Sequence, residues 1–140
     1  MADAVATRVI GETREVYIVH LTNVSDGTGE ADVIKVDKST LLASDGAEPA
    51  ALDIERVAWN CEGMAVRVEF DHDVDDLVLA LSGHGDIDFR GDGSQGGTPP
   101  SCSLKDPRTT GGTGDLLVTT VGHTSGDTYN ITLWLRKRPD

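Results

Sequence analysis

The sequence predicts an all-β, single-domain fold, an antiparallel β-sandwich or small barrel with one long Gly-rich loop. Two observations predict it. Apolar residues recur with a period of two, and Gly, Asp, Ser, Thr and Pro separate the apolar runs at the spacing typical of sandwiches. No segment shows a clear helical period. A length of 140 residues with 38% hydrophobic residues suits one domain with its own core, spanning residues 1–140.

The first predicted strands lie in the N-terminal part of the chain. Glu15 to Thr22 has apolar residues on both faces, which is typical of a central strand. Residues 25–30, with the sequence SDGTGE, contain the Asp-Gly pair that tight hairpin turns favour. Ala31 to Asp37 is therefore predicted to return as the second strand of a hairpin.

A second hairpin is predicted between residues 52 and 70. Leu52 to Asn60 and Met64 to Phe70 both alternate, and only Cys-Glu-Gly separates them. The alternation predicts one shared face for Leu52, Ile54, Arg56 and Ala58. Leu77 to Ser82 is apolar almost throughout, and its length and the following glycine favour a buried strand.

Residues 83–114 form the predicted Gly- and Pro-rich loop. They hold more than half of the 16 glycines and three of the five prolines, around one brief strand predicted at Asp86 to Arg90. Fixing glycine costs much conformational entropy, so such a loop needs compensating contacts to become ordered. We expect it to order against a neighbouring subunit, with Phe89 and Leu104 as apolar anchors.

The last third of the chain predicts a third hairpin. Asp115 to Thr124 and Thr128 to Lys137 alternate, and Ser-Gly-Asp at residues 125–127 suits the turn between them. The alternation predicts a core-facing set and an outward-facing set on the final strand. The core-facing residues are Tyr129, Ile131, Leu133 and Leu135, and the outward-facing residues are Asn130, Thr132, Trp134 and Arg136.

The charge of the chain excludes two classes of partner. Twelve basic and 24 acidic residues give a formal net charge of −12, which opposes binding to nucleic acid and to anionic membranes. No apolar run is long enough to predict a membrane span, and Met1 to Gly11 lacks the pattern of a signal peptide. Cys61 and Cys102 lie outside any C-x-x-C pair and are predicted to be isolated thiols.

No motif in the sequence predicts a catalytic or metal-binding site. Neither acidic run completes a calcium loop, and the four histidines are scattered. No nucleophile elbow and no phosphate-binding glycine pattern occurs. The sequence therefore predicts no catalytic, cofactor-binding or metal-binding residues. The acidic residues considered are Asp71, Asp73, Asp75 and Asp76 in DHDVDD, and Asp86, Asp88 and Asp92 in DIDFRGDG.

Two stretches go beyond a generic β pattern. Val57 to Phe70 contains Trp-x-x-x-Gly-Met, and Thr119 to Lys137 contains GHTSGDTY. They resemble small structural proteins of tailed bacteriophages, and the resemblance covers residues 52–137. It implies a virion protein made in the host cytoplasm. For an acidic β-domain without enzymatic motifs, the resemblance favours a capsid decoration (cement) protein, with the major capsid protein and neighbouring copies of the chain as partners.

Residues on the predicted surface indicate self-association. Apolar residues on both faces of Glu15 to Thr22, together with an exposed Trp134, exceed what an acidic monomer needs, and such surfaces usually mark interactions. We expect a homo-oligomer, a trimer on the shell. The residues predicted to contact partners are Phe89, Leu104 and Trp134.

Two alternative functions stay open at this point. One is a head-to-tail connector or tail component, which implies far fewer copies in each virion. The other is a carbohydrate-binding β-sandwich module, which uses exposed aromatic residues and calcium at the loop from Asp86 to Asp92. The chain has only two Trp, two Tyr and two Phe residues, so an aromatic platform is sparse.

Overall fold

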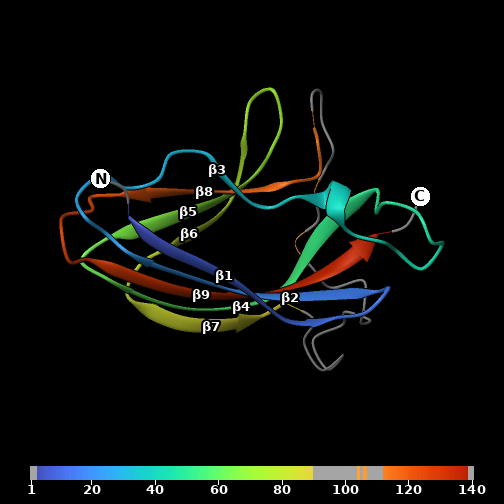
Figure 1. Ribbon diagram of the computed structural model, residues 1–140, viewed down its shortest axis with the longest axis horizontal. Helices are drawn as coiled ribbons and strands as arrows, with labels where there is room; N and C mark the ends of the chain where they lie inside the picture. The colour runs from blue at the N-terminus through green and yellow to red at the C-terminus, as the bar shows by residue number, and fades with distance from the viewer. Residues whose placement is uncertain (1–2, 90–103, 105, 107–111, 139–140) are drawn as a thin grey trace.

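The computed structural model describes residues 3–89, 104, 106 and 112–138, which form two antiparallel sheets packed face to face (Figure 1). The strands are β1 (Ala4–Glu12), β2 (Val16–Val24), β3 (Val33–Val36), β4 (Ala51–Glu62), β5 (Ala65–Phe70), β6 (Asp76–Leu81), β7 (His84–Asp88), β8 (Leu116–Val121) and β9 (Thr128–Arg138), with a 3-10 turn η1 (Lys38–Thr40). The predicted all-β sandwich is confirmed, and the sheets do not close into a barrel.

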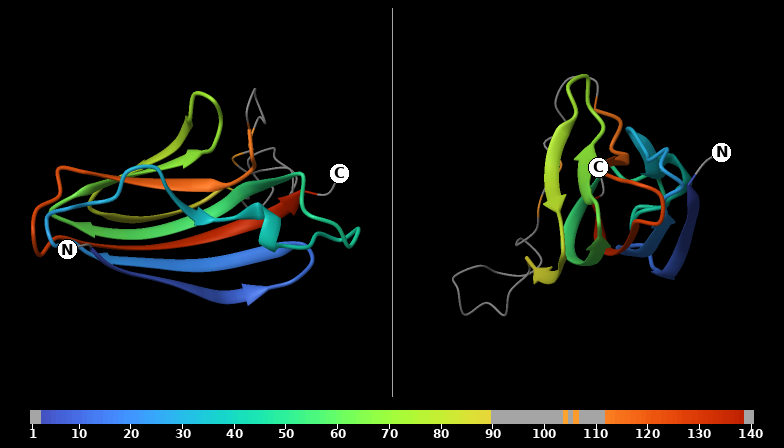
Figure 2. Two further views of the ribbon diagram at one scale, coloured as in Figure 1. Left: turned by 45° about the horizontal axis from the view of Figure 1, so that its top comes forward. Right: turned by 90° about the vertical axis from the view of Figure 1, so that its left-hand side faces the viewer.

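The order of the strands is that of a jelly roll. The five-stranded sheet runs β1-β2-β9-β4-β7, and the four-stranded sheet runs β3-β8-β5-β6. Only β1 to β2 and β5 to β6 are joined within one sheet, and every other connection crosses between the two layers seen end-on in Figure 2. Strands β2 to β9 thus make the eight-stranded double Greek key. Strand β1 is an addition to this arrangement, at the edge of the larger sheet.

Three predicted hairpins are wrong. β2 and β3, β4 and β5, and β8 and β9 each lie in opposite sheets, so neither member of these pairs bonds to the other. Alternation identifies a buried face, but it does not tell whether the next strand returns in the same sheet or crosses the core. Gly63, in the left-handed conformation at φ +83°, turns the chain from one sheet to the other.

The core confirms the predicted faces of β9 and corrects those of β4. Tyr129, Ile131, Leu133 and Leu135 are all fully buried between the sheets. In β4 the register shifts between Ile54 and Arg56, so the buried face continues through Val57 and Cys61. A bulge of this kind inserts one residue and reverses the alternation beyond it, which a regular period of two does not predict.

The predicted central strand is confirmed, whereas much of the predicted Gly-rich loop lies outside the described residues. β2 lies between β1 and β9, as a central strand should. The brief strand predicted in the Gly-rich loop is β7, which begins at His84 and pairs with β4. Residues 90–103, 105 and 107–111 of that loop lie outside the described part of the chain, and so does Cys102. Cys61 is a buried free thiol, and burial raises its pKa.

Candidate functional site

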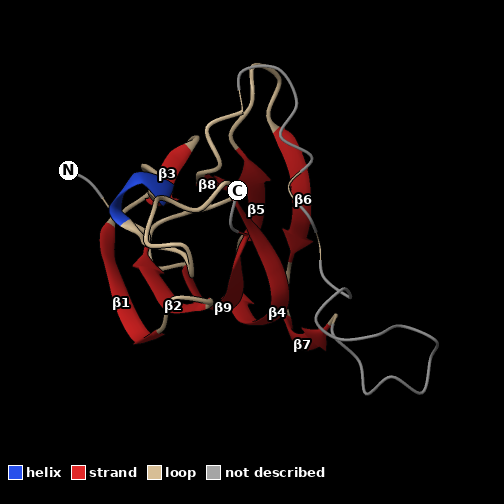
Figure 3. Cartoon of the chain, turned by 90° about the vertical axis from the view of Figure 1, so that its right-hand side faces the viewer, coloured by secondary structure: helices blue, strands red, loops and turns tan. Residues whose placement is uncertain are grey.

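One side of the sandwich is open and apolar. β1 is one edge strand of the five-stranded sheet, and β3 is one edge strand of the four-stranded sheet. Both lie on the same side of the molecule (Figure 3). Six of the eleven exposed large apolar side chains in the described residues lie on β1, on β3 or in the loop after η1. We call this set the apolar rim: Val5, Val9, Ile10, Val33, Ile34 and Leu42.

The rim is exposed because β1 has no strand opposite it. Val5, Thr7 and Val9 pair with Asn23, Leu21 and Val19 of β2, whose side chains are buried. They therefore point toward the inner side of the sheet, yet all three are exposed. The four-stranded sheet covers the inner faces of β2, β9 and β4, whose side chains are buried there. It leaves the inner face of β1 open.

Asp3 fixes the start of β1. Its carboxylate accepts hydrogen bonds from Asn23 Nδ2 and from the backbone N–H groups of Asp26 and Gly29, each at 3.1 Å. Burial raises the pKa of this carboxyl, but the hydrogen bonds together outweigh burial and lower the pKa from 3.8 to about 2. The ionised side chain thereby holds the chain end against the loop after β2.

This depressed pKa predicts acid sensitivity. A carboxyl whose pKa is lower in the folded state stabilises the fold above its unfolded pKa, and the contribution is lost as pH falls from about 4 toward 2. We expect Asp3→Asn to lower the melting temperature at pH 6 and to differ little from the wild type at pH 2. Asp73→Asn, at an exposed turn position, is the control. A difference between Asp3→Asn and the wild type that is equal at both pH values would contradict the assignment.

Glu30 closes the same end of the sandwich. Its Oε1 accepts hydrogen bonds from the Tyr129 hydroxyl at 2.6 Å and from Asn23 Nδ2 at 2.8 Å, and its Oε2 lies 2.5 Å from Lys35 Nζ. The side chains of Glu30 and Lys35 are each only 6% exposed. Burial and the Glu30 carboxylate raise the pKa of Tyr129 far above its ordinary value. The network joins β2, β3 and β9 and so fixes β3 at the rim.

Lys137 fixes the other end of the rim. Its buried Nζ donates to the Glu12 carboxylate at 2.7 Å and to the backbone carbonyls of Thr13 and Leu42 at 2.7 and 2.9 Å. These bonds hold the loop that carries Leu42 beside the turn between β1 and β2. A cleft of about 380 Å³ lies between them, lined by Glu12, Thr13, Arg14, Thr40, Leu42 and Lys137.

The outer face of the five-stranded sheet is a second, more polar surface. The Arg56 guanidinium lies 4.6 Å from the centre of the Trp134 ring and also binds Asp86. A shallow depression of about 210 Å³ lies beside them, over the small side chain of Ala58. Its polar lining includes His20, Asn60, Asn130 and Thr132.

The three predicted contact residues lie beside neighbouring positions of β4, Leu104 at Ile54, Phe89 at Glu55 and Trp134 at Arg56. Leu104 exchanges two backbone hydrogen bonds of 2.8 Å with Ile54, and Phe89 and Leu104 pack against the core of their own domain. These contacts occupy apolar surface that the sequence assigned to a neighbouring subunit. Trp134 points outward as predicted, but it is half-buried rather than exposed, and Arg56 covers part of its ring.

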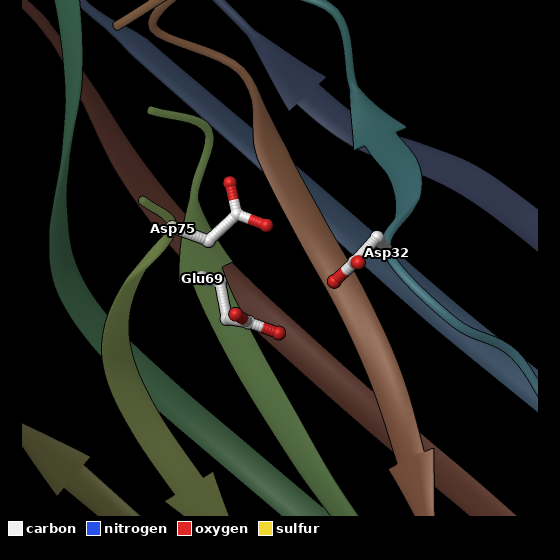
Figure 4. Close-up of side chains that lie close together, drawn as sticks. All are labelled: Asp32, Glu69 and Asp75. Atoms are coloured by element: carbon white, nitrogen blue, oxygen red, sulfur yellow. The ribbon is translucent and has the colours of Figure 1, made fainter. Parts of the chain in front are cut away.

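The sequence did not predict the cluster of carboxylates on the four-stranded sheet. Oxygens of Asp32, Glu69 and Asp75 lie within 4.8 Å of one another, with Asp32 across β8 from the other two (Figure 4). The Thr119 hydroxyl lies 3.2 Å from Asp32 Oδ1 and 3.1 Å from Glu69 Oε1. Only Asp75 belongs to the acidic run DHDVDD. Asp32 and Glu69 join it through strand packing, which spacing in the sequence does not reveal.

Repulsion in this cluster gives a stability prediction. Burial raises the pKa of Glu69, and the charges of Asp32 and Asp75 raise it further. A raised pKa favours folding below the unfolded value of 4.5, and this contribution is lost as pH rises through the folded pKa. Glu69→Gln is therefore expected to raise the melting temperature at pH 7 and to leave it unchanged at pH 3. A lower melting temperature at pH 7 would contradict a net cost of the ionised Glu69 carboxylate from burial and repulsion.

Metal-independent stability remains a prediction. Carboxylates that converge in this way can bind a hard cation such as calcium. We expect thermal melts with chelator and with added calcium to give nearly the same transition, with a strand-rich circular dichroism spectrum in both. A fall of about ten degrees on chelation would indicate a structural metal instead.

The buried pair of His72 and Asp106 belongs to the scaffold. His72 Nε2 lies 2.7 Å from Asp106 Oδ1, and both side chains are at most 1% exposed. Arg138 donates to the Asp53 carboxylate and to the Asp106 backbone carbonyl. Together these bonds tie residue 106 to the ends of β4, β5 and β9. Since the His72 and Asp106 side chains are closed to solvent, the pair is not placed to meet a substrate.

Comparison of the chain with protein families, with curated proteins and with solved structures finds no match. Within the residues that the structure describes, no helix has the length and apolar character needed to cross a membrane.

Proposed function

We propose that the chain is a non-enzymatic structural protein of a tailed-bacteriophage virion, a decoration (cement) protein that binds the assembled head. The apolar rim is the observation that carries the proposal. A chain with a net charge of −12 displays six large apolar side chains along one open side of its sandwich. Exposed apolar surface of this kind usually marks a protein interaction site.

Two further features support a role in the virion. The stretches at residues 57–70 and 119–137 that resemble phage structural proteins contain β5 and parts of β4, β8 and β9, which include the central strands of both sheets. The jelly roll is also an architecture that recurs in viral capsid domains. An architecture alone does not assign a function, so the rim and the resemblance are needed beside it.

Binding to preassembled shells tests the proposal. Shells of the major capsid protein from the same phage are mixed with the purified chain and sedimented. We expect the wild type to sediment with the shells and Ile34→Lys to bind on the order of tenfold more weakly, because a charge enters the apolar rim. Val74→Lys makes the same kind of change at the turn between β5 and β6, where the side chain is 86% exposed, and should bind normally.

Two results would overturn the proposal. One is a wild-type chain that stays in the supernatant. The other is equal binding by the Ile34→Lys and Val74→Lys variants, which would exclude the rim as the contact. A connector or tail component is the alternative within the virion, and binding to isolated necks or tails but not to shells would identify it.

Glycan binding is a second candidate function, favoured by the depression on the outer face of the five-stranded sheet. The amide, imidazole and hydroxyl groups of Asn60, His20 and Thr132 offer donors and acceptors for sugar hydroxyls beside the Trp59 ring, which also lines the depression. A glycan array probed with and without calcium tests it. Specific signals that disappear in Asn60→Ala, a change at an exposed residue of the depression, would support this function, and a blank array with both buffers would exclude it.

A further inference from the structure

Strand β1 has an unpaired edge that lacks the protection found on the other edges. Eight of its nine residues pair with β2 on one side, and no described strand pairs on the other. The other edge strands are β3, β6 and β7. β3 has only four residues and a register shift against β8, the pairing of β6 with β5 also contains a register shift, and β7 carries Asp86 and Asp88. Short length, irregular register and charge are the usual means of blocking an edge. β1 is regular from Ala4 to Val9, and Arg8 is its single charged residue over that stretch.

The low charge of β1 also allows two copies of this acidic chain to approach each other along this edge. Residues 4–11 contain no carboxylate and a single charge, Arg8, in a chain whose net charge is −12. The flanking acidic residues are engaged within the chain, since Asp3 binds the loop after β2 and Glu12 binds Lys137. Two copies therefore meet least electrostatic repulsion if they approach through β1.

We propose that two copies of the chain pair through β1 in antiparallel register about a two-fold axis at Thr7. This arrangement joins the two five-stranded sheets into one continuous sheet, as in strand addition to an exposed edge. It sets Thr7 opposite its own copy, Val5 opposite Val9 and Ala6 opposite Arg8. Threonine pairs and β-branched pairs across strands are favourable, and no like charges stand directly opposite.

Neighbouring registers are less favourable. An axis at Arg8 places two arginines face to face and brings the irregular stretch between Val9 and Gly11 into the pairing. An axis at Ala6 sets Val9 opposite Asp3, which is already bound to its own loop. The register at Thr7 alone pairs the two exposed valines of β1 with each other.

Self-pairing through β1 rests on the proposed function and deepens it by naming the surface that joins neighbouring copies. It replaces the trimer expected from the sequence with a two-fold dimer. In the dimer, the rim residues of β3 and of the loop after η1 remain available to a shell, because the pairing uses the backbone edge of β1.

Charge exchange at Thr7 tests both the dimer and its register. The two copies of residue 7 face each other, so Thr7→Lys and Thr7→Glu each place like charges at the centre. Sedimentation equilibrium over a concentration series should give a mass approaching twice 14.8 kDa for the wild type. Each variant should dimerise on the order of tenfold more weakly, and an equimolar mixture of the two should restore dimers. Thr7 is exposed, so circular dichroism and melting temperature should match the wild type.

The same substitutions at Val74 are the control and should leave the dimer unchanged. A wild-type chain that sediments only as a monomer or as a trimer would overturn the two-fold pairing. Equal dimerisation by Thr7→Lys, Thr7→Glu and their mixture would overturn the register. Shell binding by a monomeric wild type would leave the proposed function intact, whereas a dimer that ignores shells would reject the proposed function and retain the pairing.

Discussion

Replacing Glu30 with alanine is expected to lower the free energy of unfolding by about 3–5 kcal/mol. The substitution leaves the Lys35 ammonium, the Tyr129 hydroxyl and the Asn23 amide without their shared acceptor at the buried end of the sandwich. An uncompensated buried charge dominates this loss. Urea unfolding monitored by circular dichroism measures it.

Glu48→Ala provides the matched control. Glu48 also pairs with a lysine at 2.5 Å, and although the Lys38 side chain is only 10% exposed, the Glu48 side chain is 48% exposed, so the pair reaches solvent and is expected to contribute about 1 kcal/mol. Equal losses for Glu30→Ala and Glu48→Ala would show that the Glu30 network does not carry the stability assigned to it. A large loss for Glu30→Ala that Lys35→Met reverses would identify the stranded charge as its cause.

Leu133→Ala is expected to destabilise the fold by about 2–5 kcal/mol, because it removes a large side chain from the centre of the core. The adjacent variant Trp134→Ala is expected to lose only about 1–2 kcal/mol. It removes a half-buried ring and its contact with Arg56 on the outer face. Thermal and urea unfolding of both variants give the comparison. A larger loss for Trp134→Ala than for Leu133→Ala would contradict the assignment of the two faces of β9.

Alternation along single strands allowed much of the fold to be predicted. β9 follows a strict period of two from Tyr129 to Leu135, and each residue lies on the face expected for it. β4 departs from this pattern because the bulge at residue 55 reverses its faces, and no local signal in the sequence marks that position. The alternation does not predict which strands pair, since Gly63 serves equally well in a hairpin and in a turn that crosses between the sheets.

The candidate site was harder to predict than the fold. β1 was not predicted as a strand, because both of its faces are exposed and Val5, Val9 and Ile10 do not alternate with polar residues. Glu30 was predicted only as the end of a turn, although it is the centre of a buried network. Both features depend on residues far apart in the sequence. Tyr129 and Glu30 are separated by 99 positions, and only the packed sheets bring them together.

The number of copies of the chain in purified virions tests the proposed role most directly. Under the proposed function a tailed phage encodes the chain, and quantitative mass spectrometry of its virions gives this number relative to the major capsid protein. A decoration protein that binds the head through its apolar rim should be present in hundreds of copies, in a fixed ratio to the repeated shell subunits. A count of about a dozen, as expected for a connector at one vertex, or the absence of the chain from virions would contradict that role.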